Sequence, residues 1–174
     1  MSPMSLGGVS VVIVKFLKTW VVNLLIAVGS ILAVTMLILS LLSPWFITNI
    51  DQSLPGWVYE IDRHAMPVRH QIAGIKVPRN PYYPDGAPFL KIIGGIPGDV
   101  VTRHDNTFYV NGVAMVKVKT ETRNGYPLTP GPTGTIPPGH YFVFTPHKDS
   151  YDSRYAEIGW VTSEHILGTA RRIW

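Results

Sequence analysis

The 174-residue chain carries a formal net charge of +4 and contains no cysteine. Without cysteine it has neither disulfide bonds nor thiolate chemistry. Its basic residues are scattered rather than gathered in a stripe, so we expect no nucleic-acid partner.

An apolar segment near the N-terminus predicts a single transmembrane helix. No Asp, Glu, Lys or Arg occurs from Thr19 to Ile50, and about 20 apolar residues suffice to cross a bilayer core. We expect the helix itself at Trp20–Leu42, within a membrane segment of residues 19–45. Ser43-Pro44 would end it, because proline disfavours helical geometry in the residue before it.

The charges beside this segment predict its orientation. Lys15 and Lys18 precede it, so the positive-inside rule places residues 1–18 in the cytoplasm. Residues 46–174 would then form a periplasmic or extracellular domain. A cleaved signal peptide is the alternative, but its apolar core has only about 7–15 residues and precedes small residues, unlike the Ser-Pro-Trp-Phe found here.

The rest of the chain predicts a mostly β domain, because short alternating segments are separated by turn signals. About 120 residues can bury enough surface for one compact barrel or sandwich. Trp57, Tyr59 and Ile61 are expected on one face of a strand. Further strands are expected at Phe89–Ile93, Val100–Thr102, Tyr141–Phe144 and Ile166–Ile173, with an irregular proline-rich segment at 77–88 and a surface loop at 124–140.

The clearest local signal is a β-hairpin. Asn111-Gly112 lies between Thr107–Val110 and Val113–Val118. Both central residues of a type I′ turn need positive φ, which Asn and Gly adopt readily. The sequence therefore predicts two antiparallel strands joined at this pair.

Ser53 and Lys91 are the candidate catalytic residues. Period-two geometry puts Phe89, Lys91 and Ile93 on one strand face, which is apolar apart from the lysine. Burial there would disfavour the ammonium form, so we expect a lowered pKa for Lys91 and the ability to accept a proton. A serine needs such a base to attack a peptide carbonyl, and Ser-Lys pairs are a known solution. The alternative is a lysine that extends its amine to solvent.

A polar segment from Asp149 to Arg154 is the third candidate element. Asp152 and Arg154 can pair and hold a loop, and Ser150 can hydrogen-bond a neutral lysine amine. The alternative is a polar turn with a surface ion pair worth about 0–1 kcal/mol.

Together these three segments resemble the signal peptidase I family of membrane-anchored Ser/Lys proteases. Ser53 with Pro55 resembles its serine box, and Lys91 through Asp99 resembles its lysine box with the Gly-Asp end. Ser150-x-Asp152-Ser153-Arg154 matches its S-x-D-S-R box. The compact size and the local sequence of Ser53–Tyr59 are most similar to the TraF-type branch found in conjugation systems. Members of that branch mature pilin precursors, and some join the pilin ends into a ring.

The resemblance implies a signal-peptidase-like β catalytic domain with Ser53 as nucleophile and Lys91 as general base. It implies that Ser150 orients Lys91. It also implies that the pair of Asp152 and Arg154 holds the side of the site that carries Ser150 in place. No cofactor or metal is expected. The implied location is the bacterial inner membrane, with a single span, a cytoplasmic N-terminus and a periplasmic catalytic domain.

The oxyanion donors depart from the family pattern. Asp51 stands where a hydroxyl is usual, and an ionised carboxylate cannot donate a hydrogen bond. The backbone N–H of Ser53, with Gln52 or Thr48, would have to serve instead.

A substrate segment is expected to add as an extended strand beside Asp51 and Pro55 on one side and beside Ala87, Phe89 and Leu90 on the other. The expected partners are a protein substrate (a pilin precursor or a preprotein), the lipid bilayer, and components of a conjugation or type IV secretion machine.

Other functions remain open from the sequence. A general type I signal peptidase for secreted proteins would carry the same boxes. A non-catalytic anchored β-domain that scaffolds a conjugation or secretion machine would retain them as structure. A Ser-His-Asp hydrolase could use one of six histidines, but the Gly-x-Ser-x-Gly motif is absent.

Overall fold

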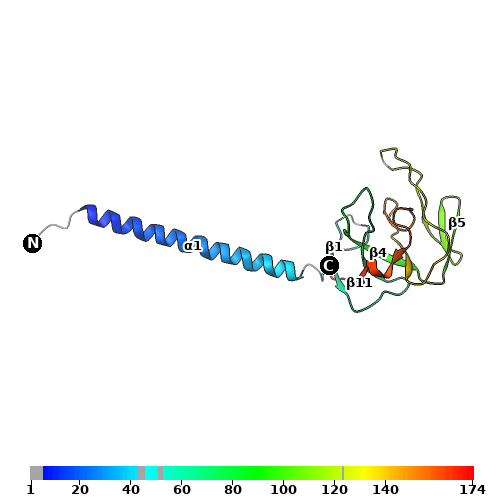
Figure 1. Ribbon diagram of the computed structural model, residues 1–174, viewed down its shortest axis with the longest axis horizontal. Helices are drawn as coiled ribbons and strands as arrows, with labels where there is room; N and C mark the ends of the chain where they lie inside the picture. The colour runs from blue at the N-terminus through cyan, green and yellow to red at the C-terminus, as the bar shows by residue number, and fades with distance from the viewer. Residues whose placement is uncertain (1–5, 43–45, 51–52, 123) are drawn as a thin grey trace, which may run out of the picture. The chain divides into compact units, whose positions relative to one another are not determined.

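The computed structural model describes residues 6–42, 46–50, 53–122 and 124–174 (Figure 1). The contacts within the chain divide it into two units, Met1–Ser43 and Pro44–Trp174.

The first unit is a single helix, α1, Leu6–Leu42. Its segment Phe16–Leu41 is long and apolar enough to cross a bilayer, and no residue of that segment is buried against protein. The Ser30 hydroxyl donates to the Ile26 carbonyl at 2.8 Å, which satisfies a polar group within the apolar stretch. The helix begins earlier than Trp20, where we expected it, and the expected stop at Ser43-Pro44 lies outside the described residues.

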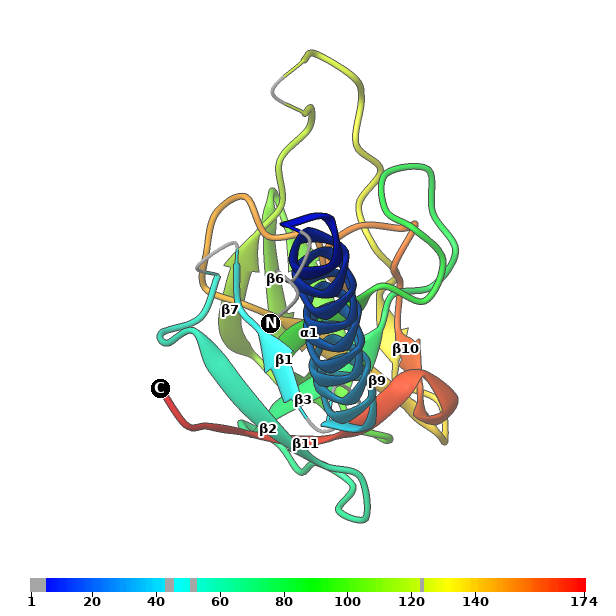
Figure 2. The same cartoon turned by 90° about the vertical axis from the view of Figure 1, so that its left-hand side faces the viewer.

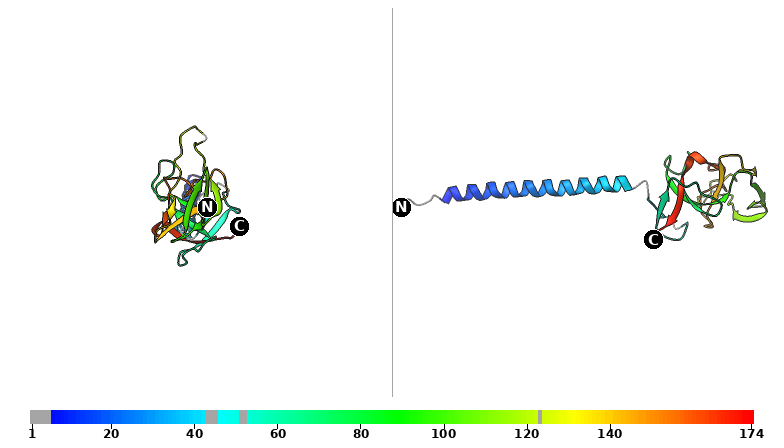
Figure 3. Two further views of the ribbon diagram at one scale, coloured as in Figure 1. Left: turned by 90° about the vertical axis from the view of Figure 1, so that its right-hand side faces the viewer. Right: turned by 90° about the horizontal axis from the view of Figure 1, so that it is seen from below.

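The second unit is built from two antiparallel sheets (Figures 2 and 3). Its elements are β1 (Phe46–Thr48), β2 (Val58–Asp62), β3 (Ile72–Lys76), β4 (Pro88–Gly95), β5 (Val100–His104), β6 (Thr107–Val110), β7 (Val113–Lys117), β8 (Gly134–Thr135), β9 (His140–Phe144), β10 (Val161–Thr162), the 3₁₀ helix η2 (Ser163–His165) and β11 (Ile166–Arg172). One sheet has the order β1-β2-β11-β3-β4-β9-β10 and the other β7-β6-β5-β8. Figure 2 shows β2 beside β11, and Figure 3 shows the green hairpin strands on the opposite side of the unit from these two.

The mostly β fold class and the predicted hairpin are confirmed. The hairpin between β6 and β7 turns at Asn111 and Gly112, with φ of 49° and 80°. Strand β4 alternates as expected, since Phe89 and Ile93 belong to one apolar cluster and Leu90 and Ile92 to another. The strand that carries Lys91 therefore has apolar packing on both of its faces.

Two expectations about the strands are wrong. Trp57 is 57% exposed, whereas Tyr59 and Ile61 are buried. The reason is that the chain turns at Gly56, with φ of +97°, and β2 begins only at Val58. The segment 124–140 is not all loop, because it contains the short strand β8, which pairs with β5.

Asp99 joins the turn after β4 to the hairpin of the second sheet. Its buried carboxylate accepts hydrogen bonds from Arg69 Nη2 at 2.6 Å, from Asn111 Nδ2 at 2.8 Å and from the Ile96 N–H at 2.8 Å. Burial raises the pKa of Asp99, but these hydrogen bonds and the Arg69 charge outweigh burial and leave the pKa below its ordinary value. The ionised form is therefore the one that stabilises the fold.

Replacing Asp99 by Asn should lower the free energy of unfolding at neutral pH by about 1–3 kcal/mol, because a buried charged acceptor is lost. A carboxyl with a lowered folded-state pKa contributes fully above its unfolded pKa, and this contribution is lost as pH falls through the folded value. Urea unfolding from neutral pH to about pH 3 should therefore show the difference from wild type shrinking in acid. A difference that stays constant with pH would contradict the assignment.

Candidate active site

Ser53 lies in a turn between β1 and β2 whose carbonyls are held by buried side chains. Asn49 Nδ2 donates to the Leu54 carbonyl at 2.5 Å and to the Gly56 carbonyl at 2.8 Å. The buried Tyr59 hydroxyl donates to the Pro55 carbonyl. Three successive carbonyls after the serine are thus tied to the sheet, which fixes the backbone that carries its hydroxyl.

Lys91 lies in β4, which is flanked by β3 and β9. Only 2% of the residue is exposed, and Lys91 Nζ donates to Ser150 Oγ at 2.8 Å. The Phe89 ring centroid lies 4.9 Å from Nζ. A cation–π contact favours the ammonium by about 0.5–2 kcal/mol, which is less than the effect of full burial on a lysine. We therefore expect burial, rather than the ring contact, to dominate the environment of the amine.

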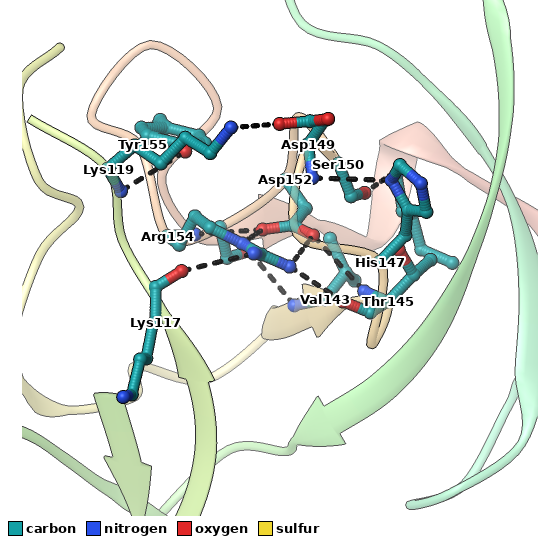
Figure 4. A network of polar contacts seen from close by, with 12 residues as sticks. Lys117, Lys119, Val143, Thr145, His147, Asp149, Ser150, Asp152, Arg154 and Tyr155 are labelled. Atoms are coloured by element: carbon teal, nitrogen blue, oxygen red, sulfur yellow. Dashed lines mark hydrogen bonds and ion pairs between the residues drawn. The ribbon is translucent and has the colours of Figure 1, made fainter. Parts of the chain in front are cut away.

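Asp152 and Arg154 form a fully buried ion pair rather than a surface one (Figure 4). Arg154 Nε and Nη2 donate to the two carboxylate oxygens of Asp152 at 2.7 and 2.9 Å. The guanidinium also donates to the Thr145 carbonyl at 2.6 Å and the Lys117 carbonyl at 3.1 Å. The pair thereby joins β7, the end of β9 and the Ser150 segment.

Two cavities meet at Ser53. The first has a volume of about 480 Å³ and is lined by both Ser53 and Lys91, together with Ser150. The second is lined by residues 53–57, Ile92, Pro146 and His147. Ser53 and His147 line both cavities, so the two cavities adjoin at these residues and form one cleft.

Aromatic side chains form one wall of the first cavity. The rings follow one another, with centroid separations of 4.8 Å for Phe89–Tyr83, 5.7 Å for Tyr83–Tyr151 and 5.8 Å for Tyr151–Tyr155. Burial raises the pKa of the Tyr151 hydroxyl, and the nearby Glu157 charge raises it further. The Tyr151 hydroxyl in this wall therefore stays uncharged.

The structure brings together most, but not all, of the expected site residues. Phe89 lines the first cavity and Pro55 the second. Ala87 and Leu90 lie beside them in or next to β4, but neither lines these two cavities. Thr48 lies exposed in β1, paired with Val58, and lines neither cavity.

The candidate residues Asp51 and Gln52 lie outside the described part of the chain, so their expected contacts remain predictions. Within the described ranges, His, Cys, Asp and Glu side chains form no group of three or more placed to hold a metal ion.

Sequence reasoning missed Asn49. A single asparagine before a serine carries no recognisable signal, because its two carbonyl partners are reached only after the chain has turned. Its backbone N–H, which donates to the Trp57 carbonyl at 2.8 Å, adds a third link across the turn.

Comparison with known proteins identifies relatives along most of the chain. The family model "Signal peptidase, peptidase S26" matches residues 17–174. The conjugal transfer protein TraF of Agrobacterium tumefaciens is 32% identical over 90 residues, 51% of this chain and 49% of that protein. TraF of Agrobacterium fabrum is 24% identical over 144 residues, covering 72% and 80%. Signal peptidase I of Pseudomonas fluorescens is 26% identical over 143 residues, covering 62% and 49%. The match thus spans about half the length of two of these relatives.

Proposed function

The chain belongs to the signal peptidase family, peptidase S26, and on that premise we propose that Ser53 and Lys91 are its catalytic dyad. One observation carries the proposal. The buried amine of Lys91 is held by Ser150 in the wall of the cavity that Ser53 also lines. A serine and a desolvated amine in one cavity are what acyl transfer without histidine requires.

In the proposed reaction, Ser53 Oγ bonds to the scissile carbonyl carbon while neutral Lys91 takes the hydroxyl proton. Collapse of the tetrahedral intermediate breaks the C–N bond, and Lys91 returns the proton to the leaving amine. An acyl-enzyme on Ser53 remains. Attack by water then gives a cut product, whereas attack by the substrate's own N-terminal amine, held close to the ester, gives a ring.

The edge of β4 supports an extended mode of substrate binding. Ile93 exchanges both of its backbone hydrogen bonds with the β3 side, through Gln71 and His70. Because these groups alternate along a strand, those of Leu90 face the opposite edge. There β9 pairs with β4 only from Ile92 to Gly95. The edge at Pro88–Leu90 is thus not paired with another strand in the described structure, and a substrate strand can add there.

We propose as substrate a membrane-associated precursor, either a pilin propeptide or a signal peptide, cut at the outer face of the bacterial inner membrane. The similarity to two TraF conjugal transfer proteins favours the pilin precursor, with conjugation or type IV secretion components as partners. The apolar helix α1 would be the anchor, with a cytoplasmic N-terminus and a periplasmic catalytic domain. The second candidate is general signal peptidase activity, favoured by the similarity to signal peptidase I.

The test uses the full chain in detergent micelles and a lactam probe that acylates serine. Wild type should be labelled at Ser53 and a Ser53→Ala variant should not. Labelling that persists in the variant would reject Ser53 as nucleophile, and absence of labelling in wild type would favour the scaffold alternative. Mass spectrometry of co-expressed pilin precursor then separates the products, since a cyclic product is one water molecule lighter than the linear one.

The hydrogen bonds of Asn49 predict that this residue is needed to position Ser53. Asn49→Asp keeps the shape but replaces the donating amide with a carboxylate, so the Leu54 and Gly56 carbonyls lose their partner. Misplacing the serine should slow its labelling by about 10²-fold. Asn80→Asp is the control, because Asn80 also donates to a backbone carbonyl, that of Pro78, but lines neither cavity. A wild-type rate in Asn49→Asp would show that the hydrogen bonds do not position Ser53.

A further inference from the structure

His147 has a position in the cleft that no other histidine shares. All six histidines lie in the described residues, and His147 alone lines the cavities at Ser53. It stands in the segment after β9 that also carries Ser150, the partner of Lys91 Nζ (Figure 4). Its side chain is exposed and therefore accessible to a bound peptide.

The hydrogen bonds of this segment determine which ring nitrogen of His147 can donate. The Asp149 backbone N–H donates to His147 Nδ1 at 3.2 Å. A backbone N–H can only donate, so Nδ1 is the unprotonated acceptor and the ring proton lies on Nε2. The His147 carbonyl accepts from the Ser150 N–H at 3.1 Å, which further orders the segment. His147 therefore presents an N–H donor on the side of the ring away from Asp149.

The same contact argues against a Ser-His-Asp relay. In such a triad the imidazole Nδ1–H donates to a carboxylate, which holds the tautomer needed for Nε2 to accept the serine proton. Here Nδ1 accepts a hydrogen bond from the backbone, so Nε2 carries the proton and cannot take another. The histidine in the cleft is a donor, not a base.

Attack on a carbonyl at Ser53 needs such a donor. The oxygen becomes an anion, and preorganised N–H groups that face it supply much of the rate enhancement. The other polar side chains of the first cavity do not reach the second, and several are engaged: Ser150 with Lys91, and Lys119 with Asp149. His147 and Ser53 both line the two cavities, so a peptide that extends from one cavity into the other can contact both residues.

We propose that His147 donates its Nε2–H to the carbonyl oxygen of the scissile bond as that oxygen becomes the tetrahedral oxyanion. No proton leaves the ring: the serine proton goes to Lys91, and His147 contributes a hydrogen bond that is strongest in the transition state. The proposal rests on the proposed function, because it takes Ser53 as the nucleophile.

The test measures the second-order rate of Ser53 acylation by the lactam probe, whose carbonyl passes through the same kind of oxyanion. His147→Ala should lower the rate by about 10²–10³-fold, the usual cost of one oxyanion donor. His147→Gln restores a side-chain N–H without a titratable base and should recover to within about tenfold of wild type, with the wild-type pH profile. His64→Ala, on an exposed residue that lines neither cavity, is the control.

Three results would overturn the proposal. They are an unchanged rate in His147→Ala, a His147→Gln variant as slow as His147→Ala, and a loss in His147→Ala that disappears at saturating probe, which would indicate ground-state binding alone. Wild-type protein that fails to be labelled, or Ser53→Ala that is labelled, would instead count against the proposed function. The two failures are therefore distinguishable.

Discussion

Replacing Lys91 by Met or Arg should reduce acylation and substrate cleavage by about 10⁴-fold or more, the scale of loss when a member of a catalytic unit is removed. Methionine has nearly the same shape but no basic nitrogen. Arginine keeps the charge, but its pKa is too high for it to release a proton and act as a base. Lys91→Met should fold, because methionine suits the apolar surroundings of a residue that is only 2% exposed. Lys91→Arg is the harder fit, so its folding is checked before its activity is compared.

Lys76→Met is the matched control, since Lys76 lies exposed on the neighbouring strand β3. It should retain the wild-type rate. Full activity in folded Lys91→Arg would remove Lys91 from the mechanism, because that side chain cannot serve as a neutral amine.

The rate of acylation should also rise with pH. Burial favours neutral Lys91, and only the neutral amine can accept the proton of Ser53. The rate should therefore increase as pH rises through the pKa of Lys91 and level off above it. A profile that is flat from about pH 6 to 10 would contradict the dyad.

Replacing Arg154 by Met should lower the free energy of unfolding by about 3–5 kcal/mol, the largest effect on stability that we expect. The variant leaves the Asp152 carboxylate buried with no counter-ion, and the carbonyls of Thr145 and Lys117 lose their donor. Chemical denaturation followed by tryptophan fluorescence measures the change. A double variant, Asp152→Leu with Arg154→Met, should recover part of the loss because no unpaired charge remains.

The exposed pair of Arg171 and Glu60 provides the control. Its N–O distance is 2.6 Å, similar to the buried pair, but the two side chains are 79% and 41% exposed. Arg171→Met should cost no more than about 1 kcal/mol. Equal losses in Arg154→Met and Arg171→Met would show that burial adds nothing to the Asp152–Arg154 pair.

Features specified by neighbouring residues could be predicted from the sequence. Asn111-Gly112 predicts its own turn, and the alternation from Phe89 to Ile93 predicts which side chains share a face, because both depend only on local backbone geometry. The boxes around Ser53, Lys91 and Ser150 indicated the family for the same reason: each is a short continuous segment.

Features that depend on distant parts of the chain could not be predicted. In the larger sheet β11 lies between β2 and β3, so the last strand of the chain separates two strands that are consecutive in sequence. Burial of Asp152 and Arg154 depends on carbonyls from β7 and from the residue after β9. Trp57 was misjudged because positive φ at Gly56 rotates the chain just before the strand begins.

The proposed nucleophile and the proposed base belong to parts of one domain with unequal local stability. Lys91 lies in a strand bonded to neighbours on both edges, whereas Ser53 lies in a turn held by two side chains, Asn49 and Tyr59. Regions with few backbone ladder bonds open at lower free energy than a central strand. On warming, the Ser53 turn would therefore open while the sheet is still folded. Activity would be lost below the melting temperature and would return on cooling.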